Sequence, residues 1–159
     1  MKRCVLAAAA LLLFTAPAFA ADLAAARAAL AGPPSAWAPA LATFQGAARA
    51  GDAGAAYWAG LMARNGKGTA PDSAAALGWL TQAAQGGVPD AMFVLANMLI
   101  AGEGGAADPV GGHAWLERAA AREHPGALQQ LAQMSHEAGD GERASALLKT
   151  SAHALKHGR

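Results

Sequence analysis

The sequence repeats itself every 36 residues, and this period restricts the possible folds more than any other feature of the chain. Small residues, methionines and tryptophans recur at this step: Ala55, Ala91 and Ala127; Gly60, Ala96 and Ala132; Met62, Met98 and Met134; Trp79 and Trp115. Several positions that keep one register indicate a shared structural unit. A period of roughly 20 to 50 residues is typical of arrays in which each small unit stacks on the next.

The first half of each unit has the pattern of a helix that ends in a glycine turn. Small residues between Ala55 and Ala63 recur at helical spacing, which predicts a helix over about residues 52–64. The segment Asn65-Gly66-Lys67-Gly68 follows, and Gly102 and Gly104 repeat its two glycines in the second unit. Glycine enters left-handed backbone conformations without steric cost, so these residues predict a turn.

The second half of each unit is predicted to be another helix. Asp72 is placed to cap it, since an aspartate side chain accepts a hydrogen bond from the free backbone amides of a first turn. The helix then continues past Trp79 and stops at Gly86-Gly87, and Asp108-Pro109 opens its copy in the second unit. The third unit has a turn about four residues shorter, at Gly139-Asp140-Gly141.

Stacked helix pairs make the predicted fold class all-α, an α/α solenoid of antiparallel helix pairs with about three repeats and an N-terminal helical cap. Alanine dominates the 54% of residues that are hydrophobic, and alanine favours helices while burying little area. The expected organisation is a signal peptide (1–20), a cap of degenerate repeat character (21–50), repeat one (51–86), repeat two (87–122) and repeat three with a C-terminal capping helix (123–159).

Three expectations concern packing. Gly60 and Ala96 should let paired helices approach closely. Trp79 and Trp115 should supply most of the apolar area of their units, so that truncation of either would cost roughly 3–5 kcal/mol if it is fully buried. Gly111-Gly112 should make the second helix of repeat two the loosest part, because helical glycine costs about 1 kcal/mol relative to alanine.

The first twenty residues have the pattern of a secretory signal. Lys2 and Arg3 precede an apolar stretch, and Ala18-Phe19-Ala20 provides small residues for cleavage after Ala20. The expected location is therefore the periplasm or the exterior, with no stable membrane insertion after cleavage. Removal of the two basic residues leaves 10 basic against 11 acidic residues, a balance that does not indicate nucleic-acid binding. The only cysteine, Cys4, would be lost, which excludes disulfides from the mature chain.

The run from Ala55 to Gly68, followed by Asp72, Trp79 and Ala83-Ala84, resembles the unit of the Sel-one-like repeat family. This family is a branch of the tetratricopeptide-type solenoids, and the resemblance covers residues 51–152. It implies an α/α solenoid that acts as an adaptor for other proteins. Some members with cysteine-closed units are linked to β-lactam binding or hydrolysis. The mature chain has no cysteine, so this activity is not carried over.

Solenoids of this kind bind partners on the concave side, which the first helices line. The family pattern implies that this side presents Tyr57, Leu61, Arg64 and Asn65 in repeat one, Phe93, Asn97 and Ile100 in repeat two, and Gln129, Gln133, His136 and Glu137 in repeat three. Tyr57 and Phe93 would form an aromatic stripe, and Asn97 and Gln133 an amide stripe. Rings and amides together suit an extended peptide, because amides pair with its backbone. The alternative interpretation is that the aromatic residues only pack.

The sequence offers little for catalysis or metal binding. The glycine turns lack the preceding strand and third glycine of a dinucleotide loop. His153 and His157 could face one way, but two ligands are too few for a dedicated zinc site. Ser135 and His136 point about 100° apart on a helix and make no catalytic pair. We therefore expect a non-catalytic scaffold without cofactors that binds a protein or peptide. The alternatives are an envelope hydrolase or β-lactam-binding protein, and a structural module that associates with itself.

Overall fold

The computed structural model describes residues 16–157 and is helical throughout, apart from turns. The predicted fold class is confirmed. Eight α-helices and one short 3-10 helix follow one another in this part of the chain: α1 (Ala16–Ala29), the 3-10 helix η1 (Pro34–Ala36), α2 (Trp37–Arg49), α3 (Ala53–Asn65), α4 (Ser73–Gln85), α5 (Pro89–Ala101), α6 (Pro109–Ala120), α7 (Pro125–Glu137) and α8 (Gly141–His157). Most of the predicted signal peptide, residues 1–15, lies outside the described residues.

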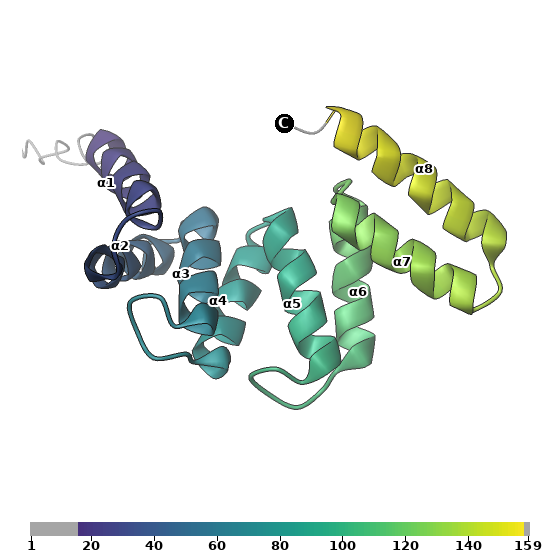
Figure 1. Ribbon diagram of the computed structural model, residues 1–159, viewed down its shortest axis with the longest axis horizontal. Helices are drawn as coiled ribbons and strands as arrows, with labels where there is room; N and C mark the ends of the chain where they lie inside the picture. Colours follow the sequence, from purple (N-terminus) through teal and green to yellow (C-terminus); the bar gives the residue numbers. More distant parts are fainter. Residues whose placement is uncertain (1–15, 158–159) are drawn as a thin grey trace, which may run out of the picture.

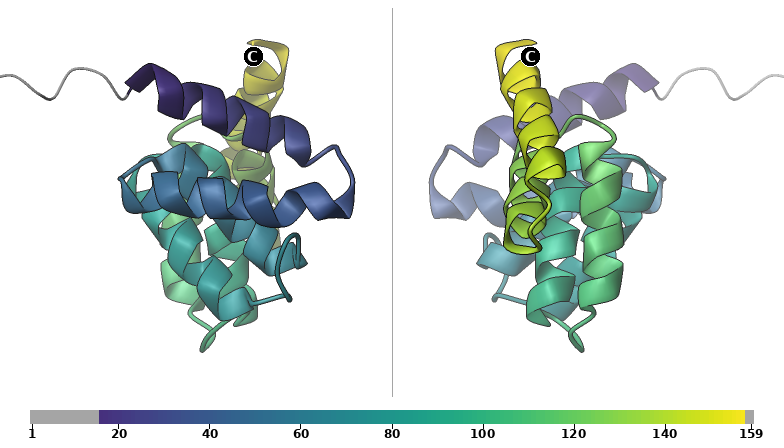
Figure 2. Two further views of the ribbon diagram at one scale, coloured as in Figure 1. Left: turned by 90° about the vertical axis from the view of Figure 1, so that its left-hand side faces the viewer. Right: turned by 90° about the vertical axis from the view of Figure 1, so that its right-hand side faces the viewer.

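The helices form a curved row in which each contacts the next. The closest pairs are α3 with α4, α5 with α6 and α7 with α8, and each pair also packs on the one that follows it (Figure 1). Figure 2 looks at the row from its two ends, where α1 and α2 lie at one end and α7 and α8 at the other. None of the described helices is long and apolar enough to cross a membrane.

Aspartates cap the second helix of every unit, as expected for Asp72 and Asp108. The carboxylate of Asp72 accepts a hydrogen bond from the Ala75 amide at 2.9 Å, and Asp108 does the same for Gly111 at 2.9 Å. Asp140 repeats the contact in the last unit. Because three equivalent caps start α4, α6 and α8, they fix a common register for comparing residues along these helices.

The glycine turns do more than reverse the chain. Gly66, Gly68, Gly102 and Gly104 all have positive φ, between 69° and 84°. A Cβ at Gly68 would lie 2.7 Å from the Trp37 carbonyl carbon at the start of α2. A Cβ at Gly104 would overlap the carbonyl of Ser73 at the start of α4. The second glycine of each turn therefore lets the turn pack on the preceding second helix.

The core of the row is made of alanine with a few large side chains. The large side chains among the described residues that are fully buried include Phe44, Met62, Leu80, Leu95, Met98, Leu116 and Leu131. Leu80 and Leu116 occupy equivalent positions, eight residues after the capping aspartate. Trp79 and Trp115, which were expected to supply most of the apolar area of their units, are only partly buried at the edge of the core, so the condition of full burial is not met. Neighbouring residues on a helix point about 100° apart, so only one of each pair can face inward.

Two glycines inside helices allow close packing. A Cβ at Gly60 would lie 2.7 Å from Cγ of Leu80, which agrees with the expectation for α3 and α4. Gly112 in α6 is buried, and a Cβ there would lie 2.6 Å from Cγ1 of Ile100 and 2.8 Å from the Ala96 carbonyl oxygen. The glycine that should weaken α6 is therefore also the residue that lets α6 approach α5.

Candidate functional site

The two aromatic residues of the predicted binding surface are half-buried and sit beside other rings. Tyr57 in α3 contacts Trp58, with ring centroids 5.5 Å apart. Burial of the phenol, and secondarily the charge of Asp90, raise the pKa of Tyr57 above its ordinary value. Phe93, the equivalent residue in α5, stacks on His124 with centroids 4.7 Å apart. Both rings therefore contribute to packing, while part of each surface is accessible.

Arg64 joins two repeats. Its guanidinium donates two hydrogen bonds to Glu103, Nε to Oε1 at 2.7 Å and Nη2 to Oε2 at 2.6 Å. Ser73 donates to the same carboxylate at 3.3 Å. The hydrogen bond from Arg64 lowers the pKa of Glu103, and the bond to Glu103 raises the pKa of Arg64. Glu103 lies between the glycines of the second turn, and its equivalent Lys67 places its ammonium 5.2 Å from the ring centre of Trp37. The turn residue thus reaches the preceding unit in both repeats.

The two residues of the predicted amide stripe, Asn97 and Gln133, make different contacts. Asn97 in α5 accepts a hydrogen bond from Gln130 in α7 at 3.0 Å and donates to the Phe93 carbonyl at 2.9 Å. Gln133 donates instead to Glu137 at 2.7 Å, one turn along α7. Asn97 and Gln130 therefore connect α5 and α7, and Gln133 does not take part. The side chain of Asn97, like that of Arg64, already forms hydrogen bonds within the protein.

His124 is a structural residue that the sequence analysis missed. Its Nδ1 accepts a hydrogen bond from the Ala127 amide at 3.1 Å and so caps α7. Its Nε2 lies 3.1 Å from Asp90 Oδ1 in α5. An accepting Nδ1 requires the neutral tautomer with the proton on Nε2, which then donates to Asp90. The signal available in the sequence was Pro125, because proline at the first position of a helix points to a cap before it.

Repeat three brings three of the predicted binding residues together. Gln129, Gln133 and His136 lie along α7 and face Ser145 and Leu148 of α8 across a groove of about 390 Å³. The remaining predicted residues lie apart from this groove: Leu61 and Ile100 are half-buried, and Asn65 and Glu137 are exposed at the ends of α3 and α7. Their assignment to a partner stays a prediction.

Leu148 on this groove is exposed where its equivalents are buried. It stands eight residues after the capping Asp140, as Leu80 and Leu116 stand after their own caps. Leu80 and Leu116 are 0% exposed, whereas Leu148 is 52% exposed. Helices α4 and α6 are each followed by another helix that packs on them, and α8 is the last helix within residues 16–157. Two helical turns further along α8, Leu155 is 61% exposed.

Across the described residues, no three histidine, cysteine, aspartate or glutamate side chains gather closely enough to hold a metal ion. The rings of His153 and His157 approach each other, with centroids 4.5 Å apart, on the outer side of α8.

Comparison with known proteins relates the chain to two solved structures. No family model matches it, and neither does any curated protein. A protective antigen of uropathogenic Escherichia coli strains, described as displaying an SLR fold, is 22% identical and superposes with a TM-score of 0.75 over 86% of this chain. A Sel1 repeat protein from Oxalobacter formigenes is 26% identical, with a TM-score of 0.66 over 85% of this chain.

These alignments cover 30% and 45% of the two other proteins, so the chain spans less than half of their length. The similarity extends over nearly the whole described row of helices. The resemblance suggested by the repeat pattern is therefore confirmed at the level of the fold, and the chain folds as a helical solenoid of the SLR type.

Proposed function

We propose that the protein is an exported, non-catalytic scaffold that binds a partner protein through the groove between α7 and α8. The observation that carries this proposal is the exposure of Leu148, whose equivalents Leu80 and Leu116 are completely buried. Burial of a leucine side chain is worth about 1.5–3 kcal/mol, so a partner that covers it gains free energy. The polar rim of the groove, Gln129, Gln133 and His136, belongs to the surface that the family pattern implies.

The proposed occupant is an amphipathic helix of the partner. Helix α3 packs on α2, α5 on α4 and α7 on α6, so a helix against α8 would continue an arrangement that the described chain already uses three times. Leu148 and Leu155 are seven residues apart and lie on one side of α8, as helical spacing requires. Lys149 and Lys156 stand next to them and are exposed. The partner helix should therefore carry apolar residues flanked by acidic ones.

Binding can be tested with two matched variants of the mature chain. Leu148→Asp places a charge in the groove, and Val110→Asp makes the same kind of change on α6, where Val110 is 82% exposed. Proteins captured from the native envelope fraction would be identified by mass spectrometry. The candidate would then be purified, and its affinity for each variant measured by titration calorimetry. We expect Leu148→Asp to weaken binding at least about tenfold and Val110→Asp to leave it unchanged.

Two results would overturn this assignment. One is a purified partner that binds Leu148→Asp as tightly as the unmodified chain. The other is light scattering that shows a dimer or filament lost on Leu148→Asp, because the occupant would then be a second copy. A synthetic peptide of the partner's binding segment should become helical on binding, as followed by circular dichroism.

Export is the other part of the proposal, and it is supported by the signal pattern that ends at Ala20. Expression of the full-length chain in a bacterial host, followed by separation of periplasm and cytoplasm, provides the test. We expect a periplasmic product whose intact mass corresponds to a start at Ala21. A product that keeps residues 1–20 and stays in the cytoplasm would contradict export.

A further inference from the structure

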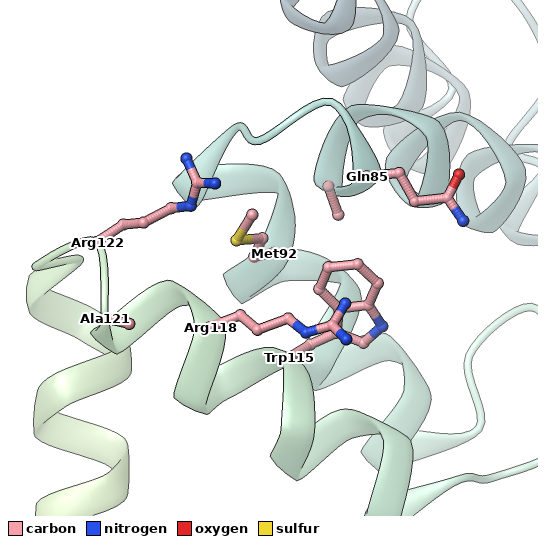
Figure 3. Close-up of a pocket in the computed structure, with 7 residues that line it drawn as sticks. Gln85, Met92, Trp115, Arg118, Ala121 and Arg122 are labelled. Carbon is pink, nitrogen blue, oxygen red and sulfur yellow. The ribbon is translucent and has the colours of Figure 1, made fainter.

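A second surface hollow lies between the end of α4, the start of α5 and α6, and it shares no residue with the α7–α8 groove. Its volume is about 580 Å³, and Ala84, Gln85, Met92, Trp115, Arg118, Ala121 and Arg122 line it (Figure 3). Met92 is 3% exposed and Ala84 1% exposed, so they form an apolar floor. The partly buried indole of Trp115 forms one wall. The hollow can therefore accept an apolar side chain.

Two arginines hold positive charge at this hollow. The Arg118 guanidinium lies over the Trp115 indole, 4.5 Å from the ring centre, as Figure 3 shows. Nη1 of Arg122 donates to the Gly87 carbonyl at 2.9 Å in the loop that joins α4 and α5. The ion pairs that arginines form in the described part of the chain join Arg64 to Glu103 and Arg143 to Glu117, and they include neither Arg118 nor Arg122. Both guanidiniums at the hollow are therefore positioned and keep donors for an anion.

The preceding unit shows that the arginines are specific to repeat two. Trp79 is the equivalent of Trp115, but Gln82 and Gly86 stand where Arg118 and Arg122 stand. Gln82 donates to the Ala48 carbonyl at 2.5 Å instead. Arg49, from α2, approaches Trp79 at 5.8 Å. The fold thus needs neither arginine to place a tryptophan at this position.

We infer that this hollow binds a carboxylate attached to an apolar side chain. A guanidinium recognises a carboxylate through two parallel hydrogen bonds, and the adjacent indole and methionine bury the apolar part. Two sources supply this chemistry in a peptide. One is the carboxylate of an apolar C-terminal residue, and the other is a glutamate or aspartate side chain next to an apolar residue. The exposed amide of Gln85 at the rim can pair with the peptide backbone.

N-Acetyl-leucine, which carries the free carboxylate, and N-acetyl-leucinamide, which lacks it, provide a matched pair of probes. The signal of the Trp115 indole N–H in the nuclear magnetic resonance spectrum of the mature chain reports binding, and its absence in Trp115→Phe assigns it. We expect the acid to shift this signal with a dissociation constant of about 1 mM, and the amide to bind at least about tenfold more weakly. Added salt should weaken the binding of N-acetyl-leucine, because the two guanidiniums are exposed and salt screens their charge.

Variants then identify the charges involved. Arg118→Gln and Arg122→Gln should each weaken binding of N-acetyl-leucine about tenfold, since a hydrogen bond to a charged group is lost. Arg49→Gln removes the same charge beside Trp79 and should leave binding unchanged. Far-UV circular dichroism of all variants confirms that the helices persist. Equal binding of acid and amide, an undiminished shift in both pocket variants, or no shift with either probe would overturn the inference.

A second titration separates the two sources of the carboxylate. One peptide ends in leucine with a free carboxylate, and a second is its C-terminal amide. A third, also amidated, has glutamate before the leucine. Stronger binding of the first supports recognition of a chain end, and stronger binding of the third supports recognition of an acidic side chain. Equal binding of the second peptide with the others would contradict the proposal.

Discussion

Replacement of Gly60 by alanine should destabilise the protein, although the same change inside a helix normally stabilises it. Alanine is favoured over glycine in a helix by about 1 kcal/mol. The new Cβ would lie 2.7 Å from Cγ of Leu80 and 3.3 Å from its backbone nitrogen. Ordinary carbon contacts are about 3.5–4.0 Å, and overpacking of this kind costs about 1–3 kcal/mol. The net loss should therefore be about 1 kcal/mol.

Gly78 provides the control in the neighbouring helix. It lies in the middle of α4, and apart from the adjacent backbone of its own helix no atom lies within 4 Å of a Cβ placed there. Gly78→Ala should thus stabilise the protein by about 1 kcal/mol, the full helix-propensity difference. The two changes are chemically identical, so an opposite sign isolates the close approach of α3 and α4. Urea unfolding of the protein, followed by far-UV circular dichroism, gives the free energy of unfolding for each variant.

A double substitution tests the named contact. Leu80→Ala alone should cost about 2–5 kcal/mol, because Leu80 is completely buried. In that variant the Cγ is gone, and the further change Gly60→Ala should stabilise by about 1 kcal/mol, so the two substitutions are coupled by about 2 kcal/mol. If Leu80→Ala fails to fold, Gly60→Ala can be compared with two control variants, Gly46→Ala and Gly78→Ala. Both controls replace a helical glycine at which a Cβ meets no obstruction. Additive effects, or a Gly60→Ala variant as stable as Gly78→Ala, would refute the reasoning.

Three other predictions follow from the packing and the ion pairs. Leu116→Ala should cost about 2–5 kcal/mol and Trp115→Ala less, because Leu116 is buried and Trp115 only partly so; urea unfolding compares them, and a larger loss for tryptophan would contradict the corrected core. The pKa of Glu103 is lowered by Arg64, so the ion pair stabilises the fold above the ordinary glutamate pKa and stops doing so as the pH falls through the folded-state pKa. Relative to Glu103→Gln, the natural protein should lose up to about 1 kcal/mol more between pH 6 and about 3, and parallel stability curves would refute this. His124→Ala should lower the free energy of unfolding by about 1–2 kcal/mol, and His124→Asn by less, because asparagine restores the cap; equal losses would assign the effect to the Phe93 contact alone.

The sequence predicted those parts of the fold that depend on contacts within a few residues. Asp72 and Asp108 were assigned as caps because the amide that each accepts is only three residues away. The left-handed turns at Gly66 and Gly102 follow from the conformational freedom of glycine. The repeat period then established that the helix pairs stack, because a single alanine-rich pair buries too little area to be stable alone.

Features that depend on how each helix is rotated about its axis could not be predicted from the sequence. Trp79 and Leu80 both recur 36 residues later, and size alone favoured the tryptophan as the core residue. The structure buries the leucine instead, since the face of α4 that meets α3 is set by the close contact at Gly60. The bond between Arg64 and Glu103 spans 39 residues and depends on the stacking angle between units, which the spacing of residues does not reveal.

Stacking between units also explains the positions of the two candidate binding surfaces, the α7–α8 groove and the hollow beside Trp115. Within the row, each unit covers the next. Some residues that the family pattern places on the accessible side, such as Arg64 and Asn97, therefore form hydrogen bonds to the neighbouring unit. A binding surface therefore needs a place where the repeat is broken. Repeat three breaks it through its short turn and the uncovered Leu148, and repeat two breaks it through two arginines that repeat one lacks. Departures from the repeat, rather than the repeat itself, identify the residues that are free to act on another molecule.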